Sequence, residues 1–555
     1  MADFSDSFEK KIIFLYNNKQ FLELESEIEK ISKEKRTNSL TYMLGISKYF
    51  KPNKVHDDLI QAQLCFKECY QNNENYIDAF NNLISTSLTL KHYNYLISIL
   101  NKRKDKFGES FLINLGLAEC YFFLAEIKKS IFYYKKIIYN KKLTLKQWST
   151  FVFINNYIKP KSKNEYIKII EIFNNKIVKQ DPNKLVNLDI KPSDNKLRIG
   201  FISPDFGSHS IKNFIFGTLK HLKNENLELV SFSLLERKDK YLQNLFHEWN
   251  AIGHLNDIDL INFIREKKIN ILIDLSGHAA GNRIAIFKNK LAPIQIGWLG
   301  YCNSTGIEGM DYIIADQNLI KKNEKKDYTE KILYMPNIWN SSDNYSEELE
   351  INTLPAIEKN YFTFGCFNNF QKINPETIKL WSRILKETNS RLVLKTSMYP
   401  SKDLNEHTLN LFLEEGVNVD QVQILKRTKT IKEHLQLYNS IDLSLDTHPY
   451  PGVTTSFESI WMGVPVLTLR GFNFLSRCGE SININLGLKN FICNDDDDFV
   501  NKAILLTKNL NYLNDLRINL RELAKKSHLF NSKNFAKDFS LNLKKTWNKY
   551  LENSI

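Results

Sequence analysis

A 34-residue repeat in the first third of the chain is the feature that most restricts how it can fold. One segment has Leu117, Tyr121, Leu124, Ile127, Ser130 and Tyr134 at helical spacing, and 34 residues earlier stand Leu83, Ser87, Leu90, Tyr93, Leu96 and Leu100. This period is typical of a helix–turn–helix unit that stacks on its neighbours. We therefore expect residues 1–185 to form a short solenoid of helical hairpins, with a plain helical bundle as the alternative.

Short β-rich runs begin near Pro192 and alternate with helical patterns along the rest of the chain. Six runs, from "LRIGFIS" to "KILYMP", precede residue 350, and five more, from "YFTFGCFN" to "VPVLTL", follow residue 360. Strands that alternate with helices favour parallel sheets covered on both faces. We expect two Rossmann-like α/β domains, residues 195–350 and 360–555, joined to tetratricopeptide-like repeats. In such sheets a ligand binds beyond the carboxyl ends of the strands.

Composition narrows the class of protein and its surroundings. The formal net charge is +13, but the lysines are interleaved with acidic residues as on ordinary solvated helices, so no nucleic-acid partner is expected. No apolar run is long enough to span a bilayer, and the first residues lack the order of a signal peptide. Seven scattered cysteines without a CxxC pair predict reduced thiols and a cytoplasmic location. The acidic run from Asp495 to Asp498 is expected to be a loop.

Generic catalytic signatures are absent from the sequence. It contains no GxGxxG, GxxxxGK[ST], HExxH or GxSxG motif, which disfavours dinucleotide redox chemistry, P-loop hydrolysis, zinc proteolysis and the α/β-hydrolase mechanism. Polar residues instead follow the predicted strands: Asp205, His209, Asp274, His278, Gly300, Cys302, Asn368, Asn369, Lys372, His434, Thr454, Thr455 and Glu458. The turn at Pro451-Gly452 opens a predicted helix, and the free N–H groups of a helix N-terminus suit a phosphate.

Five segments carry a resemblance to a known family. They are "LRIGFISPDFGSHS", "LAPIQIGWLGYCNSTGIEGMDYIIAD", "GCFNNFQKINPETIKLWSRIL", "DLSLDTHPYPGVTTSFESIWMGVPVLTL" and "FLSRCGES". In this order, over residues 197 to about 550, they resemble the tetratricopeptide-bearing protein O-glycosyltransferases, namely the O-GlcNAc transferases and the plant SPINDLY proteins. The resemblance implies a GT-B fold, a nucleotide-sugar donor, and Ser or Thr of proteins as acceptors.

The resemblance also implies roles for residues on the donor side. Lys372 matches the family lysine beside the donor diphosphate, where a compact cation suits a developing anion. Thr454 and Thr455, with the amides after Gly452, match the turn that cradles the diphosphate; simple helix capping is the alternative, and both roles can hold together. Glu458 matches an acidic residue near the ribose. Asn369 and His434 match positions that line the nucleoside, and a solvated histidine on a helix face is the alternative for the second.

The sugar side of the site is less sharply defined. Inverting transfer needs a general base, stabilisation of positive charge on the sugar, and neutralisation of the leaving diphosphate. The resemblance marks His209 near the sugar, either as the base or as a residue that orders its loop. Asp205, Asp274 and His278 are lesser candidates; Asp205 is expected to cap the following turn and Asp274 to anchor its loop. A lysine and a helix N-terminus can neutralise the diphosphate, so no metal or cofactor is expected.

Departures from the family pattern leave the donor open. Val453 stands where animal O-GlcNAc transferases have histidine, and Cys302 where most relatives have proline in the turn after Gly300. "FNNFQK" and "TTSFES" lean towards SPINDLY, which uses a GDP-fucose donor. We place UDP-GlcNAc first, GDP-fucose second and the UDP-glucose of N-glucosyltransferases third, with a non-catalytic repeat scaffold as the competing class. The repeats are expected to recruit the acceptor protein and are compatible with a homo-oligomer.

Overall fold

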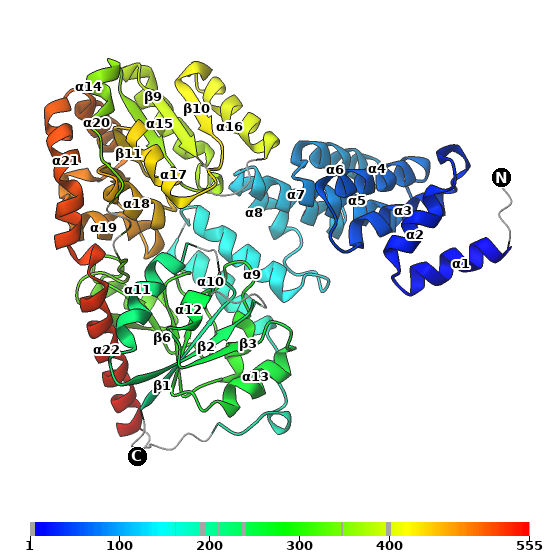
Figure 1. Cartoon of the computed structure of the whole chain (residues 1–555), viewed down its shortest axis with the longest axis horizontal. Coiled ribbons are helices and arrows are strands. Elements are labelled where there is room, and N and C mark those ends of the chain that lie inside the picture. Colours follow the sequence, from blue (N-terminus) through cyan, green and yellow to red (C-terminus); the bar gives the residue numbers. More distant parts are fainter. Residues whose placement is uncertain are drawn as a thin grey trace. The chain divides into compact units, whose positions relative to one another are not determined.

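The computed structural model describes residues 6–160, 162–188, 196–207, 210–235, 240–343, 345, 348–395 and 401–553. The chain divides into two compact units (Figure 1). The first comprises residues 1–142 with 401–407, and the second comprises residues 143–400 with 408–555. Among the described residues, no helix combines the length and the apolar character needed to cross a bilayer.

The first unit is a stack of helices. Its members are α1 (Asp6–Asn17), α2 (Phe21–Glu29), α3 (Asn38–Phe50), α4 (His56–Asn72), α5 (Ile77–Leu90), α6 (Tyr93–Phe107), α7 (Phe111–Phe123) and α8 (Ile127–Lys135). The predicted repeat is confirmed, because α5–α6 and α7–α8 are successive hairpins. The expected core positions in both hairpins are buried, apart from a half-buried Tyr121.

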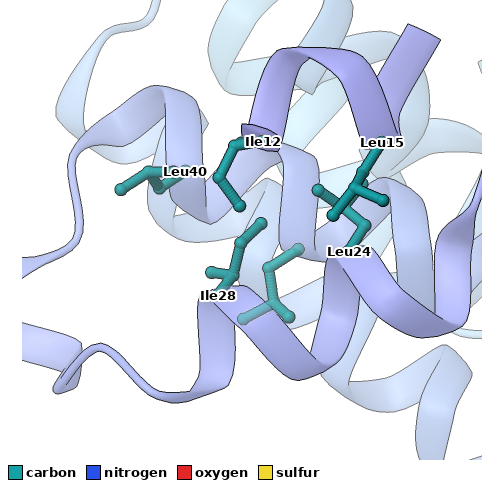
Figure 2. Packing of buried hydrophobic residues seen from close by; sticks show 6 residues of the cluster. Ile12, Leu15, Leu24, Ile28 and Leu40 are labelled. Carbon is teal, nitrogen blue, oxygen red and sulfur yellow. The ribbon is translucent and has the colours of Figure 1, made fainter. Parts of the chain in front are cut away.

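The N-terminal end of the solenoid has a core of its own. Figure 2 shows the side chains of Ile12, Leu15, Leu24, Ile28 and Leu40, from three consecutive helices, pointing towards one another. All of them are less than 10% exposed. This aliphatic packing stabilises the first helices, because each buried side chain contributes about 1.5–3 kcal/mol of transfer free energy.

The second unit contains two parallel sheets. The first has the order β3-β2-β1-β4-β5-β6-β7 and the second the order β10-β9-β8-β11-β12-β13. The first sheet is built from β1 (Leu197–Ser203), β2 (Leu227–Ser233), β3 (Glu248–Ala251), β4 (Ile271–Asp274), β5 (Ile294–Gly297), β6 (Tyr312–Ala315) and β7 (Lys331–Tyr334). The second is built from β8 (Thr363–Cys366), β9 (Arg391–Lys395), β10 (Val422–Leu425), β11 (Leu443–Leu445), β12 (Val466–Leu469) and β13 (Ile492–Cys493).

Helices cover both sheets. Those of the first are α11 (Lys212–Leu222), α12 (Lys240–Gln243) and α13 (Asp257–Glu266). Those that follow are α14 (Pro355–Lys359), α15 (Pro375–Thr388), α16 (Lys402–Glu414), α17 (Ile431–Gln436), α18 (Thr454–Trp461), α19 (Cys478–Leu486), α20 (Asp496–Thr507), α21 (Leu510–Lys526) and α22 (Ser532–Glu552). Two further helices, α9 (Leu145–Ile154) and α10 (Lys163–Lys176), also belong to this second unit, joined by the 3-10 turn η2 (Asn155–Tyr157).

The sheets follow the predicted alternation, with two strands beyond those expected. β3 reads EWNA and is only half-buried, and β13 has two residues, so neither contains an apolar run that predicts a strand. The expectation of a loop at Asp495–Asp498 is wrong. Asp495 is the N-cap of α20 and accepts a hydrogen bond from the Asp498 amide at 2.9 Å, because acidic side chains stabilise the positive end of a helix.

Each sheet reverses its strand order at one point, and this places the site. The reversal falls between β1 and β4 in the first sheet and between β8 and β11 in the second. Ligands of open α/β sheets bind beyond the carboxyl ends of the strands at such a switch point. The loops after β8 and β11 hold Asn368 and Asp446, the loop after β1 holds Asp205, and Asp274 is the last residue of β4.

Two connections tie the sheets together. Arg477 and Glu324 form a two-pronged ion pair, with contacts of 2.5 and 2.9 Å, and both side chains are largely buried. The last helix, α22, returns to the first sheet and runs beside α11 (Figure 1). There the ring of Phe539 lies 4.6 Å from that of Trp298, which follows β5.

Candidate active site

The helix α18 begins without a side-chain cap. Its N-cap is Val453, and neither threonine of the first turn caps it. The Thr455 hydroxyl instead donates to the Asn368 side-chain oxygen, and the Ser456 hydroxyl to the Gly452 carbonyl at 3.1 Å. In the part of the chain that the structure describes, no acceptor binds the amides of Thr454 and Thr455. Free N–H groups at a helix N-terminus can bind an anion, and the capping alternative does not hold for Thr454 and Thr455.

A buried aspartate that the sequence did not single out shapes the turn before α18. One Asp446 carboxylate oxygen accepts from the Gly452 amide at 2.7 Å and from the Asn368 side chain at 3.2 Å. The other accepts from the Thr468 hydroxyl at 2.8 Å. Burial raises the pKa of Asp446, and the surrounding donors oppose that rise. Asp446, which follows β11, thus connects the Pro451-Gly452 turn to the end of β8 through Asn368 and to β12 through Thr468.

Lys372 lies beside this turn. Its Nζ donates to the Pro451 carbonyl at 2.9 Å and stands 4.0 Å above the ring centroid of Tyr450. Burial lowers the pKa of Lys372 to about 8, although the nearby Asp446 opposes the shift. Lys372 bonds to Pro451, which precedes the first residue of α18, Thr454, by three positions. Its positive charge can therefore act on the same anion as the helix amides.

His434 and Glu458 contact each other. Lys395, which the sequence did not single out, donates from its Nζ to His434 Nδ1 at 2.7 Å. His434 Nε2 therefore carries the ring hydrogen and donates to the Glu458 carboxylate at 3.0 Å. His434 is only 15% exposed and both its nitrogens are engaged, so it is not a solvated surface histidine.

Asn369 keeps an unsatisfied acceptor near the lysine. Its backbone carbonyl accepts from the Lys372 amide at 2.9 Å, which closes the 3-10 turn η6 (Phe370–Lys372). Its side-chain oxygen is buried and meets no hydrogen-bond donor among the described residues. Buried polar atoms without a partner are rare in folded proteins, so this oxygen is available to a ligand donor.

The first sheet contributes residues that are mostly held in place by their surroundings. Asp274 accepts from the amides of Ser276 and Gly277, at 3.2 and 2.7 Å, and so anchors its loop as predicted. Burial raises its pKa to about 6. Asp205 is half-buried next to Asp274, and its amide donates to the Ser203 hydroxyl at 2.9 Å. His209 lies outside the described residues.

His278 is fully buried, and both of its nitrogens are engaged. Nε2 donates to the Thr305 carbonyl at 2.9 Å, so Nδ1 must be the acceptor for the Ser149 hydroxyl at 2.8 Å. Burial lowers the pKa of His278 to about 4, so the ring is neutral at pH 7. No ring nitrogen remains for a substrate proton, and we assign His278 a positioning role rather than a catalytic one.

Gly300 and Cys302 lie in the turn after β5. A side chain at Gly300 would place its Cβ 2.0 Å from the Leu275 carbonyl oxygen, so only glycine fits. Cys302 is buried, and its thiol lies 3.8 Å from the Leu299 carbonyl. Cys302 is also among the groups that surround Lys372, which brings this turn of the first sheet to the lysine of the second.

Metal-ligating side chains do not cluster in the parts of the chain described here. No group of three His, Cys, Asp or Glu residues is placed to share an ion. The cationic groups around the open end of α18 are instead Lys372 and, beside His434, Lys395.

Two parallel sheets with reversed strand orders, and a partly buried lysine beside the uncapped N-terminus of α18 at the strand ends of the second sheet, are features of a glycosyltransferase of the GT-B fold. Residues 169–349 and 352–539 match the model of glycosyl transferase family 41. The chain belongs to this family.

Curated relatives agree with this assignment. The probable UDP-N-acetylglucosamine–peptide N-acetylglucosaminyltransferase SPINDLY of Solanum lycopersicum is 32% identical over 374 residues, which are 66% of this chain and 40% of that protein. The corresponding SEC protein of Arabidopsis thaliana is 26% identical over 366 residues, 64% of this chain and 37% of that protein. The chain thus spans about two fifths of the length of these relatives.

The fold itself has a solved counterpart. A mutant of the Thermobaculum terrenum O-GlcNAc transferase superposes with a TM-score of 0.80 at 22% sequence identity. The match covers 94% of this chain and 100% of that one, so it includes the helical repeats as well as both sheets.

Proposed function

We propose that this chain is an inverting protein O-glycosyltransferase that transfers GlcNAc from UDP-GlcNAc to Ser or Thr of a protein. In this reaction the acceptor oxygen bonds to the anomeric carbon, the bond from that carbon to the diphosphate breaks, and UDP leaves while a base takes the hydroxyl proton. The helical repeats would recruit the acceptor protein.

One observation carries the proposal: Lys372 is held beside the uncapped end of α18. Its Nζ bonds to the Pro451 carbonyl at 2.9 Å, and the amides of Thr454 and Thr455 follow in the same turn. Together they would neutralise the leaving diphosphate without a metal, because charge placed where it develops lowers the barrier. His434, Glu458 and Asn369 would hold the nucleoside, and His209 would act on the sugar side.

A second donor, GDP-fucose, rests on the motifs that resemble SPINDLY, although the SPINDLY relatives are themselves named for UDP-N-acetylglucosamine. SPINDLY relatives are 30–33% identical to the chain, against 26% for the SEC protein. SPINDLY-like chemistry would use GDP-fucose at the same site. Both nucleotides share the diphosphate, so Lys372 and α18 would serve either, and the base contacts would decide between them.

Calorimetric titration of the full chain with UDP and GDP in parallel tests both donors. We expect UDP to bind more tightly, and Lys372→Ala to lose binding and transfer while remaining folded. Lys379→Ala is the matched control, because it removes an exposed lysine from α15. Mass spectrometry of Ser- and Thr-containing peptides after incubation with UDP-GlcNAc or GDP-fucose would identify the sugar. Tighter GDP binding would select the fucose donor, and binding of neither nucleotide would support a non-catalytic scaffold.

A further inference from the structure

The short turn η2, between α9 and α10, contacts both halves of the candidate site. The sequence groups these helices with the repeats, but the structure places them in the unit that holds the sheets. Two neighbouring residues of η2 reach different targets. Asn156 contacts the loop of residues 300–306, which follows β5, and Tyr157 contacts Tyr450 in the turn before α18, beside which Lys372 lies.

Asn156 is buried and ties two residues of this loop. Its side-chain nitrogen donates to the Tyr301 hydroxyl at 2.8 Å, and its side-chain oxygen accepts from Asn303 at 2.7 Å. The Tyr166 hydroxyl of α10 donates to the Ser304 carbonyl at 2.9 Å. Tyr301 must then donate its own hydrogen to Tyr166, at 2.5 Å, because each hydroxyl has only one. The hydrogen bonds therefore run in one direction, from Asn156 to Tyr301, from Tyr301 to Tyr166 of α10, and from Tyr166 back to the loop.

The same loop is closed from its other side. Thr305 donates from its amide at 2.7 Å and its hydroxyl at 2.5 Å to one oxygen of the buried Glu330. Gly306 adopts φ +69°, and a side chain there would meet Ile170 of α10 at 2.4 Å. The loop is thus clamped between Glu330 and the helices that flank η2, so its position depends on both.

Tyr157 acts on the second sheet. Its ring centroid lies 4.8 Å from that of Tyr450, and Phe153 of α9 lies 6.4 Å from Tyr450 and 6.3 Å from Tyr301. Tyr450 is the ring over which Lys372 Nζ stands at 4.0 Å. The Tyr450 ring beneath Lys372 is therefore packed against residues of α9 and η2.

We propose that Asn156 and Tyr157 are positioning residues of the transferase: Asn156 holds the 300–306 loop that follows β5 of the first sheet, and Tyr157 holds the Tyr450 ring beneath Lys372. The proposal rests on the proposed function for its kinetic consequence, but the placement of the loop can be measured without a substrate. Small displacements of groups that position a substrate reduce turnover by about 10- to 100-fold.

The first test measures turnover in the full chain. We expect Asn156→Ala to lower kcat about tenfold or more, with the donor KM changed less than about threefold, because the diphosphate groups lie on the other sheet. Asn155→Ala is the matched control. It removes a neighbouring buried amide whose one side-chain hydrogen bond within the described segments goes to the Phe151 carbonyl, at 2.7 Å, and should keep wild-type kcat. Equal kcat for Asn156→Ala and Asn155→Ala would overturn the role of Asn156.

The second test follows the loop through the thiol of Cys302. Cys302 is 8% exposed, so a held loop protects it from alkylation. We expect mass-spectrometric labelling with iodoacetamide to be about tenfold faster at Cys302 in Asn156→Ala. Cys493 and Cys120, both buried elsewhere, should label at the wild-type rate and so report any general loosening. Unchanged labelling of Cys302, or equal acceleration at all three thiols, would contradict the proposal.

A pair of variants tests the aromatic support separately. Tyr157→Phe keeps the ring against Tyr450 and should retain kcat, whereas Tyr157→Leu should lower it about tenfold. Equal rates for the two would show that the ring contact does not position Lys372. If the wild-type chain turns over no nucleotide sugar while Asn156→Ala still exposes Cys302, the proposed function fails and the positioning of the loop stands.

Discussion

Replacing Lys372 by methionine should make the protein more stable at neutral pH. Burial moves the pKa of this lysine from 10.5 to about 8, which corresponds to about 3 kcal/mol of cost for keeping the ammonium charged at pH 7. Methionine has no charge to bury but leaves the Pro451 carbonyl without its donor, a loss of about 1 kcal/mol. We therefore expect Lys372→Met to gain about 2 kcal/mol of unfolding free energy at about pH 7.

The gain should disappear in alkali. In the unfolded protein Lys372 keeps its proton up to its ordinary pKa of 10.5, whereas in the folded protein it releases the proton near its lowered pKa of about 8. Between these values the unfolded state binds more protons, so wild-type stability rises with pH while the variant lacks this contribution. The difference between the two proteins should shrink by about 2 kcal/mol from about pH 7 to about pH 9.5.

Urea unfolding followed by tryptophan fluorescence provides the assay. All seven tryptophans lie at residue 148 or beyond, so the signal reports on the unit that contains Lys372 and not on the solenoid. Lys379→Met controls for the loss of a surface lysine and should match the wild type at both pH values. A variant less stable than the wild type at pH 7, or a difference that does not change with pH, would refute the assignment of a strained buried charge.

Three further substitutions probe the site and its frame. Gly306→Ala should lower unfolding free energy by about 3 kcal/mol, because φ is +69° and Ile170 abuts the new methyl; an unchanged melting temperature would contradict this. Glu330→Gln should cost about 2 kcal/mol, because an amide nitrogen replaces one of two carboxylate oxygens that accept from Thr305 on one side and from Ser304 and Thr329 on the other, and equal thermal stability would show that the carboxylate is dispensable. His434→Ala should weaken nucleotide binding about tenfold in calorimetry, and unaltered affinity would remove it from the nucleoside site.

The fold was predictable where local pattern and packing agree. The helical hairpins follow from a repeat whose core positions are nearly all buried, and most strands follow from continuous apolar runs. β3 was not predictable, because a half-buried edge strand needs no apolar run. The place of α9 and α10 was not predictable either. An amphipathic helix shows that one face is buried, but not whether another repeat or a sheet covers it.

The sequence motifs indicated which residues belong to the candidate site, but not which residues they contact. The motifs indicated Lys372, His434 and Glu458, and the structure brings the last two together. The interaction partners could not be inferred, because Asp446 and Tyr450 act through contacts across distant segments. Helix capping failed as an alternative because Asn368, far away in sequence, takes the hydrogen bond of Thr455.

The return of α22 to the first sheet has a consequence for biosynthesis. The last strand of that sheet, β7, ends at Tyr334, whereas α22 begins at Ser532, about 200 residues later. At ribosomal rates this interval lasts roughly 10 to 40 s, during which Trp298 lacks its partner Phe539. The first sheet domain therefore cannot be completed in chain order, and its apolar face stays open until the last segment is made. A nascent chain of this architecture has a long window in which a chaperone can bind that face.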